Sequence, residues 1–217
     1  MKMLALDFSA PQRSAAVVID GASHGTVAQG GERVTNTASM IARALSLAGL
    51  EREAIEAIAI GLGPGSYTGI RAAIAFAEGW QLGRRVLLRG VRTADCLAAQ
   101  ARDLGWSGTV HVVIDAQRQE LYLATFAIST NGVTTLEPLR IVTLAEARAR
   151  VAGGGLVCGP EAPRWFEGGV VLSPDAAVLG RIASAGNPGL ASEQLEPVYL
   201  RETNFVKAPP PRVLPAL

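Results

Sequence analysis

The chain has 217 residues, of which 49% are hydrophobic and 18% charged, and its formal net charge is +1. This composition is typical of a folded globular protein with room for one larger domain or two small ones. The near-zero charge, without a long basic run, excludes a protein that grips RNA or DNA mainly by electrostatics.

A few residues indicate the cellular compartment and whether the chain binds a metal. Cys96 and Cys158 stand alone in apolar segments, which favours buried reduced thiols. Asp7 interrupts the N-terminal apolar run too early for a signal peptide, and no stretch is long enough to span a bilayer. The chain has neither a His-x-x-x-His nor a Cys-x-x-Cys pair. We therefore expect a cytoplasmic protein with no membrane contact and no metal site.

The first half of the chain alternates strands and helices. Periodicity predicts strands at 3–8, 14–19, 25–30, 57–61 and 86–90, and helices at 35–48, 68–82 and 93–104. Gly49, Gly83 and Gly105 follow the three helices, where helix stops are common. This order is typical of an α/β lobe.

The second half begins with a repeat of the first pattern. "HVVID", a polar turn and "LYLATFAI" have the same plan as "LALD", "FSAPQRS" and "AAVVI": an apolar strand ending in aspartate, a turn, and a strand back. Coincidence is the alternative, because strands that end in aspartate are common. A strand at 133–142 and helices at 144–151 and 176–185 follow, and then a proline-rich tail that should be extended. We expect two domains, residues 1–104 and a smaller lobe of residues 105–217.

The segment "GLGPGSYTGIR", residues 61–71, is dense in glycine. It lacks the lysine of a P-loop, the third glycine of a dinucleotide fingerprint and the flanking glycines of a nucleophile elbow. A tight strand-to-helix turn remains, in which Ser66 or Thr68 caps the helix. The same free amides could instead hold an anion. Candidate nucleotide-binding residues are thus Asp7, Gly63, Gly65 and Ser66, whereas Asp115 is expected only to cap its turn.

Two predicted helices have more apolar surface than one sheet can cover. The helix after the glycine loop is small or apolar nearly all round, and the helix before it has a second apolar stripe. Both are either internal or part of an interface with a partner. A Ser/His nucleophilic pair is hard to assemble, because His24 and His111 are the only histidines.

The segments "LALDFSA", "GLGPGSYTGIRAAIAFAEG", "VIDAQRQELYLA" and "EPVYLR" resemble, in order and spacing, the TsaB family, also called YeaZ. The resemblance covers residues 3–201, and the block from Gly61 to Arg71 is its most specific part. It implies a two-lobed actin-like/Hsp70-like (ASKHA) α/β fold, with duplicated hairpin-led lobes and a reduced second lobe.

The resemblance also implies a role in making threonylcarbamoyladenosine at position 37 of ANN-decoding tRNAs. The chain would be a non-catalytic partner of the TsaD transferase, joined by the ATPase TsaE, and would meet tRNA only indirectly. The His-x-x-x-His pair of the catalytic relative is absent, because Asn36 and Met40 stand in the matching stretch. ATP or ADP could bind at the boundary with TsaD or TsaE, although none would be held tightly by this chain.

The expected partner interface combines residues from two helices: Thr37, Met40, Ile41 and Ala44 from the first, and Gly69, Ala72, Ala73 and Phe76 from the second. Without TsaD, the chain would pair with itself through the same patch. The alternative is a nucleotide-binding, ATPase-like enzyme of the same fold that uses Asp7 and the 61–71 loop. A peptide hydrolase would need a nucleophile and a base that the sequence does not supply.

Overall fold

The computed structural model describes residues 1–30, 36–186 and 195–201. The first half forms β1 (Lys2–Asp7), β2 (Arg13–Ile19), β3 (Ala22–Gln29), α1 (Thr37–Leu47), the 3-10 turn η1 (Arg52–Ala54), β4 (Ala57–Gly61), α2 (Tyr67–Gly83), β5 (Leu87–Val91) and α3 (Thr93–Asp103). The second half forms β6 (Gly108–Asp115), β7 (Glu120–Ser129), β8 (Gly132–Thr143), α4 (Leu144–Val151), β9 (Leu156–Gly159), η2 (Ala162–Arg164), β10 (Val170–Val171) and α5 (Ala176–Ser184).

The two halves have the same sheet topology. The strand orders are β3-β2-β1-β4-β5 and β8-β7-β6-β9-β10, so the second order repeats the first strand for strand. In each lobe the opening pair of strands is an antiparallel hairpin and the later strands add in parallel. The duplication predicted from the two strand–aspartate–turn segments is confirmed, and with it the two-lobed actin-like fold. The second lobe is reduced, because β10 has only 2 residues.

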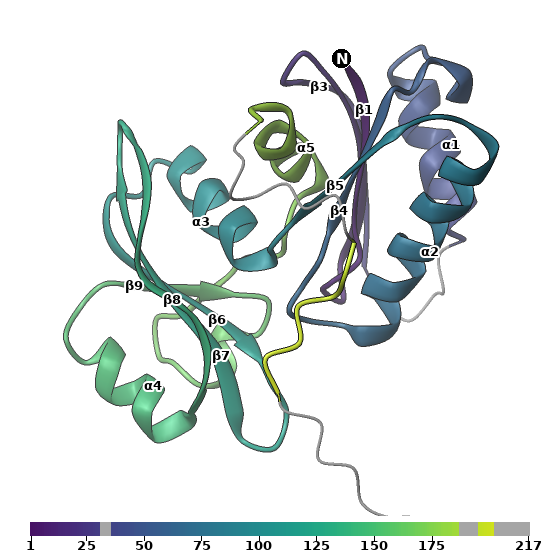
Figure 1. Ribbon diagram of the computed structural model, residues 1–217. Helices are drawn as coiled ribbons and strands as arrows, with labels where there is room; N and C mark the ends of the chain where they lie inside the picture. Colours follow the sequence, from purple (N-terminus) through teal and green to yellow (C-terminus); the bar gives the residue numbers. More distant parts are fainter. Residues whose placement is uncertain (31–35, 187–194, 202–217) are drawn as a thin grey trace, which may run out of the picture.

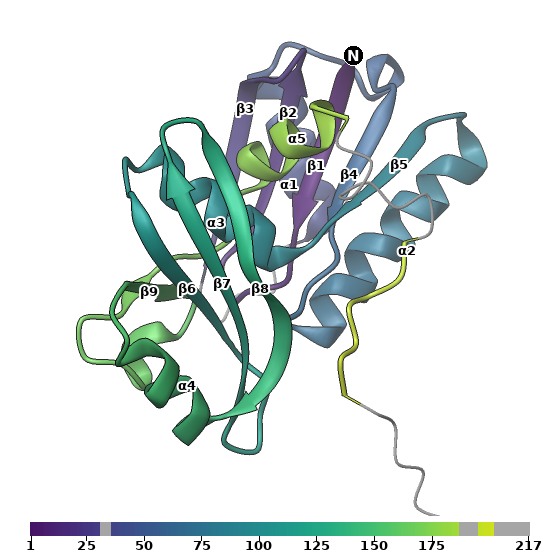
Figure 2. The same cartoon turned by 60° about the vertical axis from the view of Figure 1, so that its left-hand side comes forward.

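The elements stack as alternating layers of helix and sheet (Figures 1 and 2). Alternate residues of β1 point to opposite faces. Leu4 and Leu6 pack with α1 and α2, while Met3 and Ala5 pack with α5. In the second lobe, α3 covers one face of the sheet and α4 the other. Helices α3 and α5 contact each other between the two sheets.

The lobes exchange helices, so the expected boundary after residue 104 does not follow the packing. Helix α3 precedes that boundary, yet its Leu97 and Ala101 belong to the core of the second sheet. Helix α5 follows it, yet Gly180 lies so close to β1 and β2 that a Cβ there would meet Val18 and Ala5. Each of these two helices packs on the sheet of the other half of the chain, which chain order alone does not reveal.

The local signals place most elements within a few residues. The helix expected at 35–48 begins at Thr37, because the side chain of Asn36 accepts from the Ala38 amide at 3.0 Å; residue 35 lies outside the described residues. Ser66 caps α2 by accepting from Gly69 N at 3.3 Å. No helix among the described residues is long and apolar enough to cross a membrane.

Candidate functional site

Helices α1 and α2 lie side by side on the outer face of the first sheet (Figure 1). A groove of about 550 Å³ runs between them. Its walls are Ala38, Ile41, Ala42 and Leu45 from α1 and Phe76, Gly79, Trp80 and Gly83 from α2, and Arg52, Glu53 and Arg84 close one end. The exposed positions on its rims are small: Ala38 and Ala42 on α1, and Gly79 and Gly83 on α2. Small residues at a spacing of four let another helix approach the backbone closely.

Two aromatic side chains form one wall of the groove. Phe76 and Trp80 are half-buried and meet edge to face, with ring centroids 5.4 Å apart. The indole Nε1 of Trp80 is buried and has no hydrogen-bond partner among the described residues. An unpaired buried donor carries a free-energy cost.

The residues expected at the partner interface divide between core and surface. Met40, Ala44, Gly69 and Ala73 are buried in the core of the first lobe. Ile41 is also buried, but it lines the floor of the groove. Thr37 and Phe76 are half-buried, and Ala72 is exposed.

Close packing of α1 explains this outcome. At Gly25 of β3, a Cβ would overlap the carbonyl oxygen of Ala44. Strand β3 therefore covers α1 around Ala44. The small exposed residues beside the groove are instead Ala38, Ala42 and Gly79.

The glycine loop packs against the β1–β2 turn. A Cβ at Gly65 would overlap the carbonyl oxygen of Ser9, and one at Gly69 would overlap that of Phe8. Ser66 N donates to the same Ser9 oxygen at 2.7 Å. The glycines thus give the backbone of α2 close access to the turn.

Asp7 lies beneath this loop and is fully buried. Its Oδ1 accepts from the amide and the hydroxyl of Ser9, at 2.9 and 2.6 Å, and Thr93 Oγ1 donates to the Ser9 hydroxyl at 2.9 Å. Its Oδ2 has no partner among the described residues, and a Cβ at Gly61 would overlap it. Burial raises the pKa of the Asp7 carboxyl to about 6, against the lowering effect of the Ser9 hydrogen bonds.

The candidate nucleotide residues do not form an open phosphate cradle. Asp7 has no exposed surface, the Ser66 amide is already bonded, and Gly65 fits against Ser9. Gly63 has a φ of +88°, which shapes the turn at a position where glycine is favoured. Among the described residues, no group of three His, Cys, Asp or Glu side chains is arranged to hold a metal ion.

Asp115 occupies the equivalent position in the second lobe and caps its turn, as expected. Its Oδ1 accepts from Gln117 N at 2.7 Å, just as Asp7 accepts from Ser9 two residues on. Arg164 lies 3.6 Å from its other oxygen. Ala116 is followed by three residues with positive φ: Gln117, Arg118 and Gln119. This feature was not predicted from the sequence.

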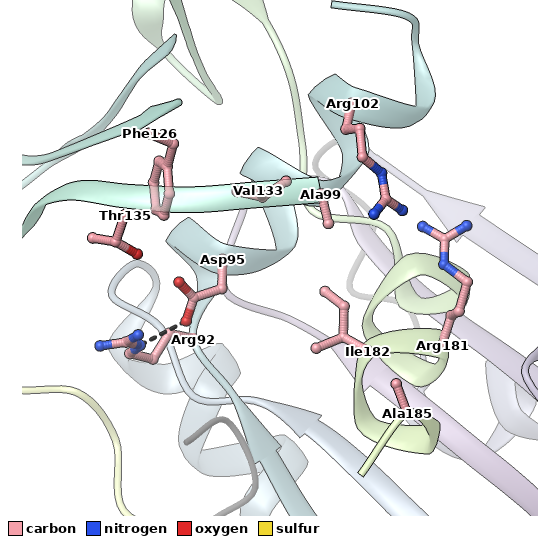
Figure 3. A pocket seen from close by; sticks show the side chains of 10 residues that line it. All are labelled: Arg92, Asp95, Ala99, Arg102, Phe126, Val133, Thr135, Arg181, Ile182 and Ala185. Atoms are coloured by element: carbon pink, nitrogen blue, oxygen red, sulfur yellow. Dashed lines mark hydrogen bonds and ion pairs between the residues drawn. The ribbon is translucent and has the colours of Figure 1, made fainter. Parts of the chain in front are cut away.

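A second pocket of about 550 Å³ lies where α3, α5 and the second sheet meet (Figure 3). Phe126, Val133, Ala99 and Ile182 supply apolar walls, and the guanidinium groups of Arg102 and Arg181 converge on one side. These cations are already paired, since both arginines bond Asp103 and Arg92 bonds Asp95 at 2.6 Å. This pocket could not be predicted from the sequence, because its walls come from three separate parts of the chain.

Comparison with known proteins connects these features to a family. Residues 32–148 match the family described as TsaD: tRNA N6-adenosine threonylcarbamoyltransferase. The chain is 30% identical over 220 residues to the tRNA threonylcarbamoyladenosine biosynthesis protein TsaB of Escherichia coli, covering 93% of this chain and 95% of that protein. It is 32% identical over 85 residues to TsaB of Haemophilus influenzae, covering 39% of this chain and 36% of that protein.

A solved structure agrees with the sequence relatives. YeaZ from Pseudomonas aeruginosa superimposes with a TM-score of 0.74 at 26% identity, over 92% of this chain and 99% of that one. The match extends over both lobes, and the TsaB of Escherichia coli matches over almost the same share of the chain. The chain therefore belongs to the TsaB (YeaZ) family of tRNA threonylcarbamoyladenosine biosynthesis proteins.

Proposed function

We propose that this chain takes part in threonylcarbamoyladenosine biosynthesis on tRNA as a non-catalytic subunit that pairs with a TsaD-type transferase. The observation that carries the proposal is the groove between α1 and α2, with its small exposed rims at Ala38, Ala42 and Gly79. A helix of the partner, lying along the groove, would cover Phe76 and Trp80. Two helices from each protein would then form a mixed four-helix interface.

Several exposed side chains extend this surface. Leu82, near the end of α2 and three residues after Gly79, is 92% exposed. Ala72 and Ala75 continue the small outer stripe of α2 towards its start. An apolar surface that combines small and large residues in this way is typical of an interface rather than of free solvent-facing helices.

A non-catalytic role is supported by what the loop residues already do. Asp7, Gly65 and Ser66 are engaged in packing and in internal hydrogen bonds. The chain would therefore support the transferase by docking and leave the chemistry to its partner. A TsaE-type ATPase would join the pair, with ATP or ADP at a subunit boundary, and tRNA would be met indirectly. Alone, the chain would form a homodimer through the α1–α2 groove.

The groove is tested with a matched pair of substitutions. Ala42→Arg places a long charged side chain on the groove rim, whereas Ala145→Arg makes the same change on α4 of the other lobe. We expect Ala42→Arg to weaken binding to the TsaD-type transferase of the same organism at least about tenfold, as measured by titration calorimetry. Ala145→Arg should bind like the parent. Equal affinities for parent and Ala42→Arg would show that the groove is not the docking surface.

Asp7 motivates a second candidate, a nucleotide-binding enzyme of the same fold. Its unpartnered Oδ2 is the kind of group that a metal–nucleotide could satisfy if the glycine loop moved away. Micromolar binding of ATP–magnesium by the isolated chain, lost in Asp7→Ala, would favour this candidate. If the folded chain does not bind ATP–magnesium, the nucleotide-binding candidate is excluded and docking is the remaining function.

A further inference from the structure

Residues 195–201, "LEPVYLR", run as an extended segment from one lobe to the other. In Figures 1 and 2 this yellow segment leaves the first lobe near α2 and descends towards the second lobe, where Arg201 reaches the turn between β6 and β7. The segment contains no helix or strand, so its position depends on a few specific contacts.

One end of the segment is held in the first lobe. Leu195 is buried against the core cluster that α1 and α2 share with the first sheet, and Val198 packs on the same cluster. The Val198 amide donates to the carbonyl oxygen of Leu62 at 2.8 Å. Leu62 opens the glycine loop, so the segment is fixed to that loop through its backbone.

The middle of the segment touches the start of α2. The rings of Tyr199 and Tyr67 lie with their centroids 5.7 Å apart. Arg71 donates to the Tyr67 hydroxyl at 2.6 Å and stacks over the Tyr67 ring at 5.2 Å. These contacts add side-chain packing at a point where the segment leaves the first lobe.

Within residues 195–201, the side chain of Arg201 holds the other end in the second lobe. The Arg201 guanidinium donates to the carbonyl oxygen of Ala116 at 2.9 Å and lies 2.7 Å from Glu120 Oε2. Ala116 and Glu120 flank the three positive-φ residues of the β6–β7 turn. The charged guanidinium of Arg201 bonds a carbonyl oxygen and pairs with a carboxylate, and such charge-assisted contacts are stronger than a hydrogen bond between neutral groups.

We propose that residues 195–201 form a clasp that fixes the angle between the two lobes, with Arg201 as its latch on the second lobe. The lobes otherwise contact each other through α3 and α5, which lie between the two sheets. The α3–α5 contact by itself would allow one lobe to rotate relative to the other about the line of that contact. A second attachment away from this line prevents the rotation. Release of Arg201 would let the lobes turn about the α3–α5 contact and free the glycine loop from Val198.

Amide hydrogen exchange of Val198 reports directly on the clasp. In the full chain, Arg201→Ala should accelerate exchange of this amide by about tenfold, because the segment loses its second attachment. Arg140→Ala, which removes an exposed arginine from β8 of the same lobe, is the matched control and should leave the rate unchanged. An unchanged Val198 rate in Arg201→Ala would overturn the latch, since the first lobe would then hold the segment unaided.

The lobe angle is measured separately with spin labels. Ser23→Cys on β3 and Ala149→Cys on α4 place one label on an exposed site of each lobe, and the native Cys96 and Cys158 are buried and so protected from labelling. We expect one narrow distance distribution in the labelled parent and a broader one when Arg201→Ala is added. Identical distributions would contradict the clasp. Glu120→Gln, which keeps the Ala116 carbonyl bond, should give an intermediate width.

Discussion

Asp7 is a buried carboxyl whose ionisation opposes folding. Its pKa is raised from 3.8 to about 6 by burial, so the folded state holds the proton at pH values where the unfolded chain has lost it. The contribution of Asp7 to stability is therefore greatest below about pH 4 and falls as the pH rises to about 6. A shift of this size corresponds to roughly 3 kcal/mol.

The Asp7→Asn variant tests this titration. Asparagine cannot ionise but can still accept from Ser9, so the stability of the variant should not carry this pH dependence. We expect the parent to lose about 2–3 kcal/mol relative to Asp7→Asn between pH 4 and pH 6.5, measured by urea unfolding at each pH. A constant difference across that range would contradict the assigned burial of the charge.

Gly69 and Gly79 belong to the same helix but have different surroundings. A Cβ at Gly69 would overlap the Phe8 carbonyl oxygen, whereas a Cβ at Gly79 would meet nothing within 4 Å. Gly69→Ala should cost about 2–3 kcal/mol through forced displacement of α2. Gly79→Ala should stabilise the chain by about 0.5–1 kcal/mol through helix propensity. Urea unfolding measures the change in the free energy of unfolding for each variant. Equal changes in the two variants would mean that the glycine loop does not pack as described.

At the level of elements, α1 and α2 show where sequence reasoning succeeded and where it stopped. The spacing of apolar residues predicted both helices and their excess of apolar surface. It could not predict that β3 would pack closely on α1 at Ala44, because that depends on the absence of a side chain at Gly25, in a different element. The exposed face beside the α1–α2 groove therefore consists largely of small residues, and the spacing of hydrophobic residues does not predict which small residues are exposed.

Helix α4 offers a change that affects stability without touching the docking groove. Thr143 caps this helix reciprocally: its hydroxyl accepts from Glu146 N at 3.2 Å, and Glu146 accepts from Thr143 N at 2.8 Å. Thr143→Ala should lower the free energy of unfolding by about 1 kcal/mol. Affinity for the TsaD-type partner should stay the same, because α4 covers the second sheet on its outer face. A loss of binding equal to that of Ala42→Arg would place the interface elsewhere.

For the whole molecule, the duplication inferred from the sequence is confirmed by the two sheets. Two aspartates at strand ends predicted two hairpins, and both hairpins open a sheet of the same strand order. The exchange of α3 and α5 between lobes was not predictable, because both helices resemble ordinary amphipathic segments in sequence. The clasp was equally hidden, since its anchors at Leu62 and Ala116 are distant in sequence from Val198 and Arg201.

The central claim is that the α1–α2 groove docks a second protein. Sedimentation of this chain mixed with the TsaD-type transferase of its organism tests it most directly. We predict a species heavier than either protein alone that contains both chains, and its loss when Ala42→Arg replaces the parent. Independent sedimentation of the two proteins, or a complex that survives Ala42→Arg unchanged, would contradict the claim.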